Sequence, residues 1–284
     1  MTALKVKING KAYQAENGEY ILDVCRRNRI LIPTLCHHEG LSGLGSCRLC
    51  VVEVNEGSGK KVVVSCVYPL NRDCEVFTES EKIKGIRRTI LSMLKTAAPA
   101  GDRLASLCNM YGVKEDGRFT ISKSEKGGPA ESSAQKRLSE ACILCGLCAE
   151  ACSNLGTGAI SAVGRGVAKR ISTPYDEPSA DCIGCGSCAA ICPTKAVECT
   201  ETGGERSIWG RNFKLLSCTS CGKAFATEEE YIFALKKANP DKDVPALTGA
   251  ECETCRKKKS ADTFAAAYGI RSNFTFTSTA NAQT

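Results

Sequence analysis

The sequence Cys142-x2-Cys145-x2-Cys148-x3-Cys152 recurs with the same spacing as Cys182-x2-Cys185-x2-Cys188-x3-Cys192, which Pro193 follows. A three-cysteine turn of this kind presents three thiolates to a [4Fe–4S] cluster, and in paired runs the fourth thiolate comes from the other run. The spacing predicts one cluster bound by Cys142, Cys145, Cys148 and Cys192, and a second bound by Cys182, Cys185, Cys188 and Cys152. Structural or disulfide-bonded cysteines are the disfavoured alternative, because short repeated spacings are typical of metal ligands.

The composition indicates several small domains rather than one large core. The chain has 284 residues, of which 20 are cysteine and only 6% are aromatic, so little apolar packing is available. Bound metal is therefore expected to supply much of the folding free energy. The first residues form no apolar leader, and no apolar run approaches about 18 residues. These features predict a cytoplasmic protein without a membrane span.

The formal net charge of +7 counts every thiol as neutral. Four centres held by four thiolates each would add roughly −8, because each carries about −2 in its oxidised form. The metal-loaded protein is then close to neutral. The excess of lysine and arginine is interpreted as compensation for this charge, and no nucleic-acid partner is predicted.

The amino-terminal residues predict an α+β domain. Residues 4–15 alternate between apolar and polar around Asn9-Gly10, which is typical of a β-hairpin. Residues 19–29 have the apolar spacing of a helix. Three further strands are expected over residues 51–54, 61–66 and 74–78.

A second cysteine constellation lies inside this domain: Cys36-x10-Cys47-x2-Cys50-x15-Cys66. Apart from a first gap widened from 4 to 10 residues, this is the plant-type [2Fe–2S] spacing. The loop that carries three of these ligands contains Gly40, Gly43 and Gly45, which allow backbone N–H groups to approach the sulfurs.

The widened spacing, within Pro33-Thr-Leu-Cys36-His-His-Glu-Gly40, Cys47-Arg-Leu-Cys50-Val-Val-Glu53 and Ser65-Cys66, resembles a known family. It is similar to the amino-terminal part of the large iron–sulfur subunit of respiratory complex I. It also resembles the diaphorase subunit of NAD-linked hydrogenases and electron-bifurcating [FeFe]-hydrogenases. The resemblance implies a β-grasp domain, a flavin-containing NAD(P)H-binding partner at the [2Fe–2S] end, and a catalytic partner such as a formate dehydrogenase or hydrogenase. Ferredoxin is a further implied partner.

The chain departs from this family between its two cluster regions. Residues 87–94 and 104–111 are expected to be helices, and the relatives bind a [4Fe–4S] cluster there through one histidine and three cysteines. This chain has no histidine in the segment and only one cysteine, Cys108. We therefore expect this cluster to be lost, the electron path to be broken or rerouted, and Cys108 to lie on an apolar helix face. Residues 114–139 are predicted to be an exposed linker.

A third constellation, Cys218-x2-Cys221 and Cys252-x2-Cys255, lies near the carboxy terminus. Between its halves, residues 227–237 predict a helix capped by Thr227. Two such pairs can complete a tetrahedral site of four thiolates. Zinc, a further Fe–S cluster and a rubredoxin-like single iron all remain open, because thiolate ligation alone does not separate them.

The remaining candidates favour ordinary structural roles. Cys25, Cys74 and Cys199 are expected in the core, and His37 and His38 in a surface loop. No G-x-G-x-x-G motif follows a strand and no phosphate-binding P-loop is present, so no nucleotide or flavin site is predicted.

These observations predict an α+β protein. Its expected parts are a β-grasp plant-type [2Fe–2S] ferredoxin domain (1–80), a helical segment and linker (81–137), a two-[4Fe–4S] ferredoxin-like domain (138–205), a small zinc-ribbon-like four-cysteine domain (206–271) and a flexible tail (272–284). The predicted function is a non-catalytic electron relay within an NAD(P)H-linked, electron-bifurcating or related oxidoreductase complex. The alternatives are a free-standing polyferredoxin carrier and, less favoured, a zinc-ribbon nucleic-acid module.

Overall fold

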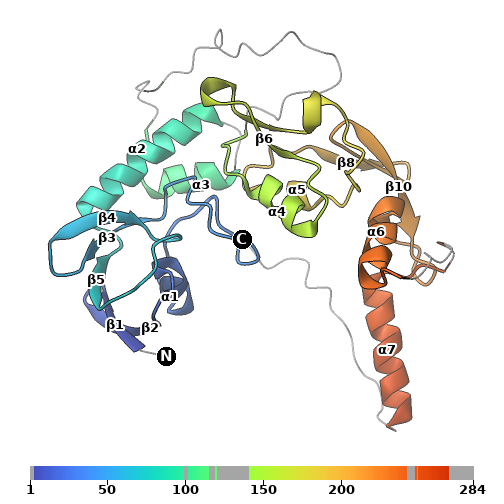
Figure 1. Cartoon of the computed structure of the whole chain (residues 1–284), viewed down its shortest axis with the longest axis horizontal. Helices are drawn as coiled ribbons and strands as arrows, with labels where there is room; N and C mark the ends of the chain where they lie inside the picture. Colours follow the sequence, from blue (N-terminus) through green and yellow to red (C-terminus); the bar gives the residue numbers. More distant parts are fainter. Residues whose placement is uncertain are drawn as a thin grey trace. The chain divides into compact units, whose positions relative to one another are not determined.

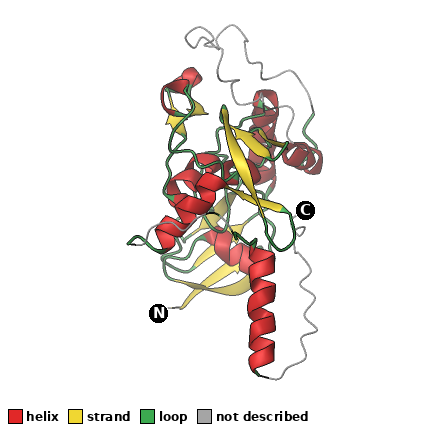
Figure 2. Cartoon of the chain, turned by 90° about the vertical axis from the view of Figure 1, so that its right-hand side faces the viewer, coloured by secondary structure: helices red, strands yellow, loops and turns green. Residues whose placement is uncertain are grey.

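The computed structural model of the chain describes residues 3–98, 102–114, 119, 141–241, 247 and 249–268. Its contacts divide it into two compact units, Met1–Cys182 with Gly186–Glu198, and Ile183–Cys185 with Cys199–Thr284. Each unit contains both strands (Figure 1) and helices (Figure 2). The mixed helix and strand content predicted from the sequence is confirmed. The predicted tail, and nearly all of the predicted linker, lie outside the described residues.

The first unit opens with a five-stranded sheet in the order β2-β1-β5-β3-β4. Its strands are β1 (Ala3–Ile8), β2 (Lys11–Glu16), β3 (Val51–Asn55), β4 (Lys60–Val64) and β5 (Cys74–Phe77). β1 pairs antiparallel with β2 and parallel with β5, while β3 pairs antiparallel with β4 and β5. The predicted hairpin is confirmed, because Asn9 and Gly10 form the turn with φ of 49° and 87°.

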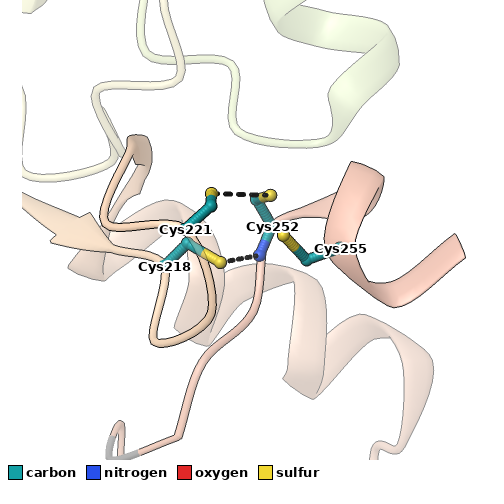
Figure 3. Close-up of side chains that lie close together, drawn as sticks. All are labelled: Cys218, Cys221, Cys252 and Cys255. Atoms are coloured by element: carbon teal, nitrogen blue, oxygen red, sulfur yellow. Dashed lines mark hydrogen bonds between the residues drawn. The ribbon is translucent and has the colours of Figure 1, made fainter. Parts of the chain in front are cut away.

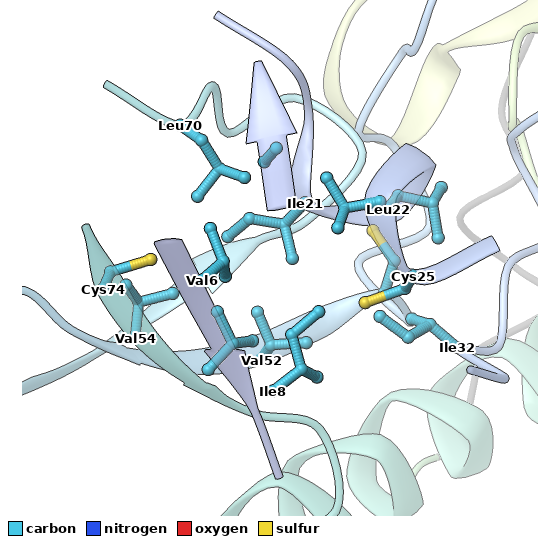
Figure 4. Packing of buried hydrophobic residues seen from close by; sticks show 14 of the residues in the cluster. Val6, Ile8, Ile21, Leu22, Cys25, Ile32, Val52, Val54, Leu70 and Cys74 are labelled. Carbon is cyan, nitrogen blue, oxygen red and sulfur yellow. The ribbon is translucent and has the colours of Figure 1, made fainter. Parts of the chain in front are cut away.

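The core of this sheet forms against helix α1 (Ile21–Arg27), as Figure 4 shows. Val6 and Ile8 point inward from β1 because alternate residues of a strand share a face, and both are 1% exposed. Cys25 and Cys74 lie in the same core, as predicted, and burial raises the pKa of their thiols to about 12 and about 11. Their packing is that of small apolar side chains.

Two helices, α2 (Glu81–Ala97) and α3 (Asp102–Met110), follow the sheet. α2 begins earlier than the sequence predicted because Ser80 caps it: the Ser80 hydroxyl accepts the backbone N–H of Ile83 at 3.3 Å. The two helices contribute Leu91, Leu104 and Cys108 to a second buried cluster. Cys108 is 1% exposed, which confirms its predicted place on an apolar helix face.

The repeated cysteine runs fold alike. α4 (Leu147–Leu155) follows Gly146 and α5 (Ser187–Ala190) follows Gly186, and both glycines are left-handed, with φ of 86° and 73°. The third cysteine of each run therefore lies in the first turn of a short helix. A small hairpin and two 3₁₀ turns separate the runs: β6 (Ser161–Val163), β7 (Arg170–Ser172), Gly166–Ala168 and Pro174–Asp176.

The second unit contains a four-stranded sheet in the order β11-β10-β9-β8. Its elements are β8 (Cys199–Thr202), β9 (Glu205–Ile208), β10 (Arg211–Ser217), β11 (Ala224–Thr227), α6 (Glu228–Ala238) and α7 (Glu253–Ala267). The predicted Thr227 cap is confirmed as a full capping box with Glu230. Cys199 is only partly buried, which corrects its predicted core position: β8 is an edge strand with one neighbour.

The segment Ile183–Cys185 packs as part of the second unit. The Thr227 hydroxyl donates to the Ile183 carbonyl at 2.5 Å, and the Arg206 guanidinium donates to the Gly184 carbonyl at 2.7 Å. The ring of Phe213 closes over Gly184 so tightly that a Cβ there would lie 2.5 Å from the ring. The loop between Cys182 and Cys188 is thus held partly by residues far away in the sequence.

A Gly184→Ala variant is expected to lose iron and stability, because the added methyl group collides with Phe213. Gly203→Ala is the matched control: Gly203 has φ of 61° against 67° at Gly184, but its Cβ would meet nothing within 4 Å. Both variants carry the left-handed backbone strain of about 1–2 kcal/mol, so their difference isolates the collision. Iron per chain and anaerobic thermal unfolding measure it. Equal losses in the two variants would contradict the tight contact.

Candidate metal centres

The long loop between α1 and β3 brings Cys36, Cys47 and Cys50 to the end of β4, where Cys66 lies. All four side chains are buried, with at most 6% of any residue exposed. They form two pairs, since the pKa of Cys36 depends most on Cys47 and that of Cys50 most on Cys66. A [2Fe–2S] cluster takes two thiolates on each iron, so the donor set and its pairing fit that cluster.

In each pair, one thiol has a lowered pKa and the other has a raised pKa. The hydrogen bond from Cys36 lowers the pKa of Cys47 to about 6, and that from Cys66 lowers the pKa of Cys50 to about 7. The pKa values of Cys36 and Cys66 are raised by the same bonds and by burial. Backbone N–H groups support the sulfurs, with Cys47 N–H donating to the Cys36 Sγ at 3.2 Å and Leu35 N–H to the Cys47 Sγ at 3.5 Å. Metal would replace the remaining protons.

Of the three glycines in this loop, Gly43 has the least room for a side chain. A Cβ at Gly43 would lie 2.5 Å from the Cys66 carbonyl oxygen, whereas one at Gly40 would meet only the His38 ring, at 3.5 Å. Gly43→Ala is therefore expected to push the loop away from Cys66 and to lower [2Fe–2S] content by about 10-fold or more, as losses around ligands do. Gly40→Ala is expected to keep it. Double integration of the reduced-state EPR signal measures the content, and an intact Gly43→Ala signal would contradict this geometry.

Arg87 of α2 supports the same site, and its side chain is 0% exposed. Its Nε donates to the Leu49 carbonyl at 3.0 Å and its Nη2 to the Val51 carbonyl at 2.9 Å, so it binds the peptide groups on both sides of Cys50. Its Nη1 donates to Glu79 and, at 2.9 Å, to the Tyr111 hydroxyl. Sequence reasoning missed this role, although residues 83, 87 and 91 share one helix face and the other two are apolar.

Cys142, Cys145, Cys148 and Cys192 all lie in the first unit. Burial is the main cause that raises the pKa of Cys145 to about 11 and that of Cys148 to about 12, and the charges of nearby cysteines, Cys192 among them, contribute to both values. Cys192 also raises the pKa of Cys142, after burial. Cys192 thus interacts electrostatically with all three of these cysteines, and Cys188 of the other predicted set also interacts with Cys148, so the crossed ligand assignment stays a prediction. The backbone N–H of Ala196 donates to the Cys192 Sγ at 3.2 Å.

The other predicted set is divided between the two units. Cys152, Cys182 and Cys188 belong to the first unit, and Cys185 belongs to the short segment grouped with the second. Cys152 lies near the end of α4, and its Sγ is 3.1 Å from the Thr157 hydroxyl. This contact gives one sulfur of the set a polar partner.

The first two cysteine sets meet in one buried cluster of the first unit. Cys36, Cys47 and Cys145 pack there with Leu35 and Leu147. The charge of Cys47 is among the contributions that raise the pKa of Cys145. Gly146 allows the contact, because a Cβ there would lie 3.1 Å from Leu44 of the long loop. Residues of both constellations thus share one buried cluster, and their two loops approach each other at Leu44 and Gly146.

The histidines beside Cys36 differ from each other. His38 is exposed, as predicted, and its Nδ1 accepts the backbone N–H of Gly40 at 3.2 Å. His37 is only partly exposed, and burial lowers its pKa. The Nδ1 atom of His37 is buried and has no hydrogen-bond partner among the described residues.

The carboxy-terminal cysteines come together in the second unit, as predicted (Figure 3). Cys218 and Cys221 lie in the turn between β10 and β11, while Cys252 caps α7 and Cys255 lies in its first turn. The four Sγ atoms all lie within 4.8 Å of one another. The backbone N–H of Cys252 donates to the Cys218 Sγ at 3.3 Å and is the leading cause that lowers the pKa of Cys218 to about 6.

Two family models match the chain. A 2Fe-2S iron-sulfur cluster binding domain matches residues 1–81, and a 4Fe-4S dicluster domain matches residues 141–196. The chain therefore has one [2Fe–2S] domain followed by one domain for two [4Fe–4S] clusters. Neither match reaches the four-cysteine site of the second unit.

Several curated proteins are similar to the chain. The NADP-reducing hydrogenase subunit HndD of Solidesulfovibrio fructosivorans is 34% identical over 215 residues, covering 69% of this chain and 36% of that protein. The NADPH-Fe(3+) oxidoreductase subunit alpha of Geobacter sulfurreducens is 31% identical over 67% of this chain and 23% of its own length. The NADH-ubiquinone oxidoreductase 75 kDa subunit of Reclinomonas americana is 30% identical over 68% and 29%. The chain spans about a third or less of these relatives.

Among solved structures, an NAD+-reducing [NiFe]-hydrogenase in the H2-reduced state matches 60% of this chain and 74% of its own chain, with a TM-score of 0.50 and 28% identity. The predicted resemblance to iron–sulfur subunits of NAD(P)-linked hydrogenases and of complex I is confirmed. None of the described helices is long and apolar enough to cross a membrane.

Proposed function

We propose that this chain is an iron–sulfur electron-relay subunit of a multisubunit NAD(P)H-linked oxidoreductase. The observation that carries the proposal is the shared buried cluster in which Cys36 and Cys47 pack with Cys145. It makes neighbours of the constellations that suit a [2Fe–2S] and a [4Fe–4S] centre. When bound, these centres accept and release single electrons.

The proposed ligands are those expected from the sequence. Cys36, Cys47, Cys50 and Cys66 hold the [2Fe–2S] cluster, and the two crossed sets of the dicluster domain hold one [4Fe–4S] cluster each. Leu35, Leu49 and Leu147 exclude water between the first two sets, since each is at most 3% exposed. Backbone N–H groups from the glycine-containing loop stabilise the charged sulfurs and help to set the potential.

The sequence predicted an electron path that is broken or rerouted, and the same packing favours the rerouted one, a direct path between the two centres. Leu91, Leu104 and Cys108 fill the space beside the two cysteine sets with apolar side chains. We propose that the histidine-ligated cluster of the relatives is absent here and that electrons pass directly between the neighbouring centres.

The five-stranded sheet with α1 supports the β-grasp assignment, and we retain the domain division given above. The relatives' names, an NADP-reducing hydrogenase and an NADPH-Fe(3+) oxidoreductase, support a partner that reacts with NADP or NADPH, and we propose that it is a flavin-containing NAD(P)H-binding subunit at the [2Fe–2S] end. A formate dehydrogenase or hydrogenase is the proposed catalytic partner, with ferredoxin as a further one, in the cytoplasm. A free-standing polyferredoxin carrier is the second candidate, because both family models that match the chain are iron–sulfur cluster domains.

The test is anaerobic purification from the native host through a tag on this chain. A flavin-containing partner should copurify. NAD(P)H should reduce the [2Fe–2S] cluster of the complex, so that the EPR signal of its reduced state appears. The chain should contain about ten irons in its three clusters. A chain that elutes alone, and that dithionite reduces but NAD(P)H with the host's soluble fraction does not, would support the carrier alternative. Far fewer irons in protein never exposed to air would refute both.

A further inference from the structure

The four-cysteine site of the second unit joins two elements that are also linked by hydrogen bonds from Thr219 to the Ala250 carbonyl and from Ser220 to Glu251. One side is the turn between β10 and β11, which carries Cys218 and Cys221, and the other is the start of α7, which carries Cys252 and Cys255 (Figure 3). Ala265 is the one buried residue within the described helix α7, while Cys252 at its N-cap is buried and Cys255 is half-buried. Beyond the residues that precede it, the helix therefore has little buried surface to hold it to the sheet, and the cysteine site is its main attachment.

The spacing of the sulfurs matches one ion. Cys221 and Cys252 have their Sγ atoms 3.8 Å apart, and all four Sγ atoms lie within 4.8 Å of one another. Four thiolates at about 2.3 Å from a tetrahedral zinc ion lie about 3.8 Å from each other. Thiolates that bind a cubane lie farther apart, because each is attached to a different iron at a corner of the cluster.

The chain contains its own comparison. The dicluster domain matches residues 141–196, where the cysteine spacing suits two cubanes. Within the described residues, the Sγ atoms of Cys218, Cys221, Cys252 and Cys255 all lie within 4.8 Å of one another, whereas no three cysteine sulfurs of that domain lie so close together. The Sγ atoms of the dicluster domain are thus farther apart than the four Sγ atoms of the second unit.

The surroundings suit a charged, redox-inert centre. Four thiolates around a divalent ion leave a net charge of about −2. The backbone N–H of Cys252 donates to the Cys218 Sγ at 3.3 Å, and the positive end of the 15-residue helix α7 faces the site. Arg256, Lys257 and Lys259 follow on the same helix. Cys221 is exposed and Cys255 half-buried, so water reaches the site, as a structural zinc tolerates.

We propose that Cys218, Cys221, Cys252 and Cys255 bind a single structural zinc ion that anchors α7 to the β10–β11 turn. Electrons then do not leave the chain through this site, because zinc has no redox chemistry. The sulfur spacing favours a single tetrahedral ion over a cluster, and the metal measurements below distinguish zinc from a single iron. The zinc proposal does not depend on the proposed relay, since neither its ligands nor its geometry involve the other cysteine sets.

The experiment compares the full-length wild-type chain with Cys255→Ser and Cys199→Ser, all produced anaerobically in medium containing both zinc and iron. Cys199 is the matched control, a half-buried cysteine of the same unit that lies on β8 outside the site. Zinc, iron and acid-labile sulfide are measured per chain. We expect about one zinc in the wild type and in Cys199→Ser, and about 10-fold less in Cys255→Ser, with iron and sulfide unchanged in all three.

Loss of about four irons and four sulfides in Cys255→Ser would overturn the proposal in favour of a cubane. Loss of one iron without sulfide would overturn it in favour of a rubredoxin-like site, and a wild-type chain without zinc would also refute it. Zinc-edge X-ray absorption of the wild type keeps the test independent of the variant's folding. Four sulfur neighbours at about 2.3 Å are expected, and oxygen or nitrogen neighbours would contradict the site. Failure of the relay would instead appear in the iron and NAD(P)H measurements.

Discussion

In a Cys47→Ala variant of the purified complex, NAD(P)H is expected to reduce the [4Fe–4S] centres more than about 100-fold more slowly than in the wild type. Loss of supporting groups around a metal already costs about 10–100-fold, and Cys47 is a proposed ligand. Cys47 hydrogen-bonds Cys36 and lies beside Cys145, so its removal breaks both the site and the neighbouring contact. Freeze-quench EPR with NAD(P)H as reductant follows the reduction. Dithionite, which can reach the [4Fe–4S] centres without the relay, should still reduce them.

The matched control for this variant is Cys108→Ala. Cys108 is a buried cysteine of the same apolar cluster, 1% exposed, but it belongs to none of the proposed ligand sets. Its variant should transfer electrons at nearly the wild-type rate and retain all iron. Equal slowing in both variants would indicate that general destabilisation, rather than a missing centre, causes the loss. Iron loss from Cys108→Ala would show that the histidine-ligated cluster of the relatives has not disappeared.

The sequence predicted the local features of the fold well, because spacing and turn chemistry are local. The Asn9-Gly10 hairpin and the Thr227 cap follow from short-range rules. Cysteine spacing likewise predicted the three groups of candidate metal-binding cysteines, since ligands on one turn must be separated by a few residues. α2 was predicted too short because its Ser80 cap lies outside the apolar pattern.

Long-range contacts could not be predicted in this way. Nothing in the sequence near Gly184 indicates that Phe213 and Arg206 enclose it, and nothing near Cys47 indicates that Cys145 is its neighbour. The close approach of Gly43 to the Cys66 carbonyl depends on the course of two segments. Such contacts arise from tertiary packing, which periodicity does not record. Cys199 illustrates the same limit, because its exposure depends on the position of β8 at the sheet edge.

Arg87→Met is expected to destabilise the first unit by about 3 kcal/mol, because it leaves two buried carbonyl groups without a donor. The Leu49 and Val51 carbonyls would both lose their Arg87 partner, while Met fills a similar volume. Glu79 adds less to this cost, since its side chain is 43% exposed and can regain water. The apparent midpoint of anaerobic thermal unfolding should fall by on the order of 10 °C.

Arg88→Met is the matched control, one residue farther along α2. Arg88 is exposed, and its Nε donates to the Tyr111 carbonyl at 3.1 Å, so its loss should cost less than about 1 kcal/mol. EPR separates a local effect from a general one. Because the Leu49 and Val51 peptide groups flank Cys50, Arg87→Met should broaden or shift the reduced [2Fe–2S] signal while the [4Fe–4S] signals stay unchanged. A similar loss of stability in both variants, or an unaltered [2Fe–2S] signal in Arg87→Met, would show that Arg87 does not position this ligand.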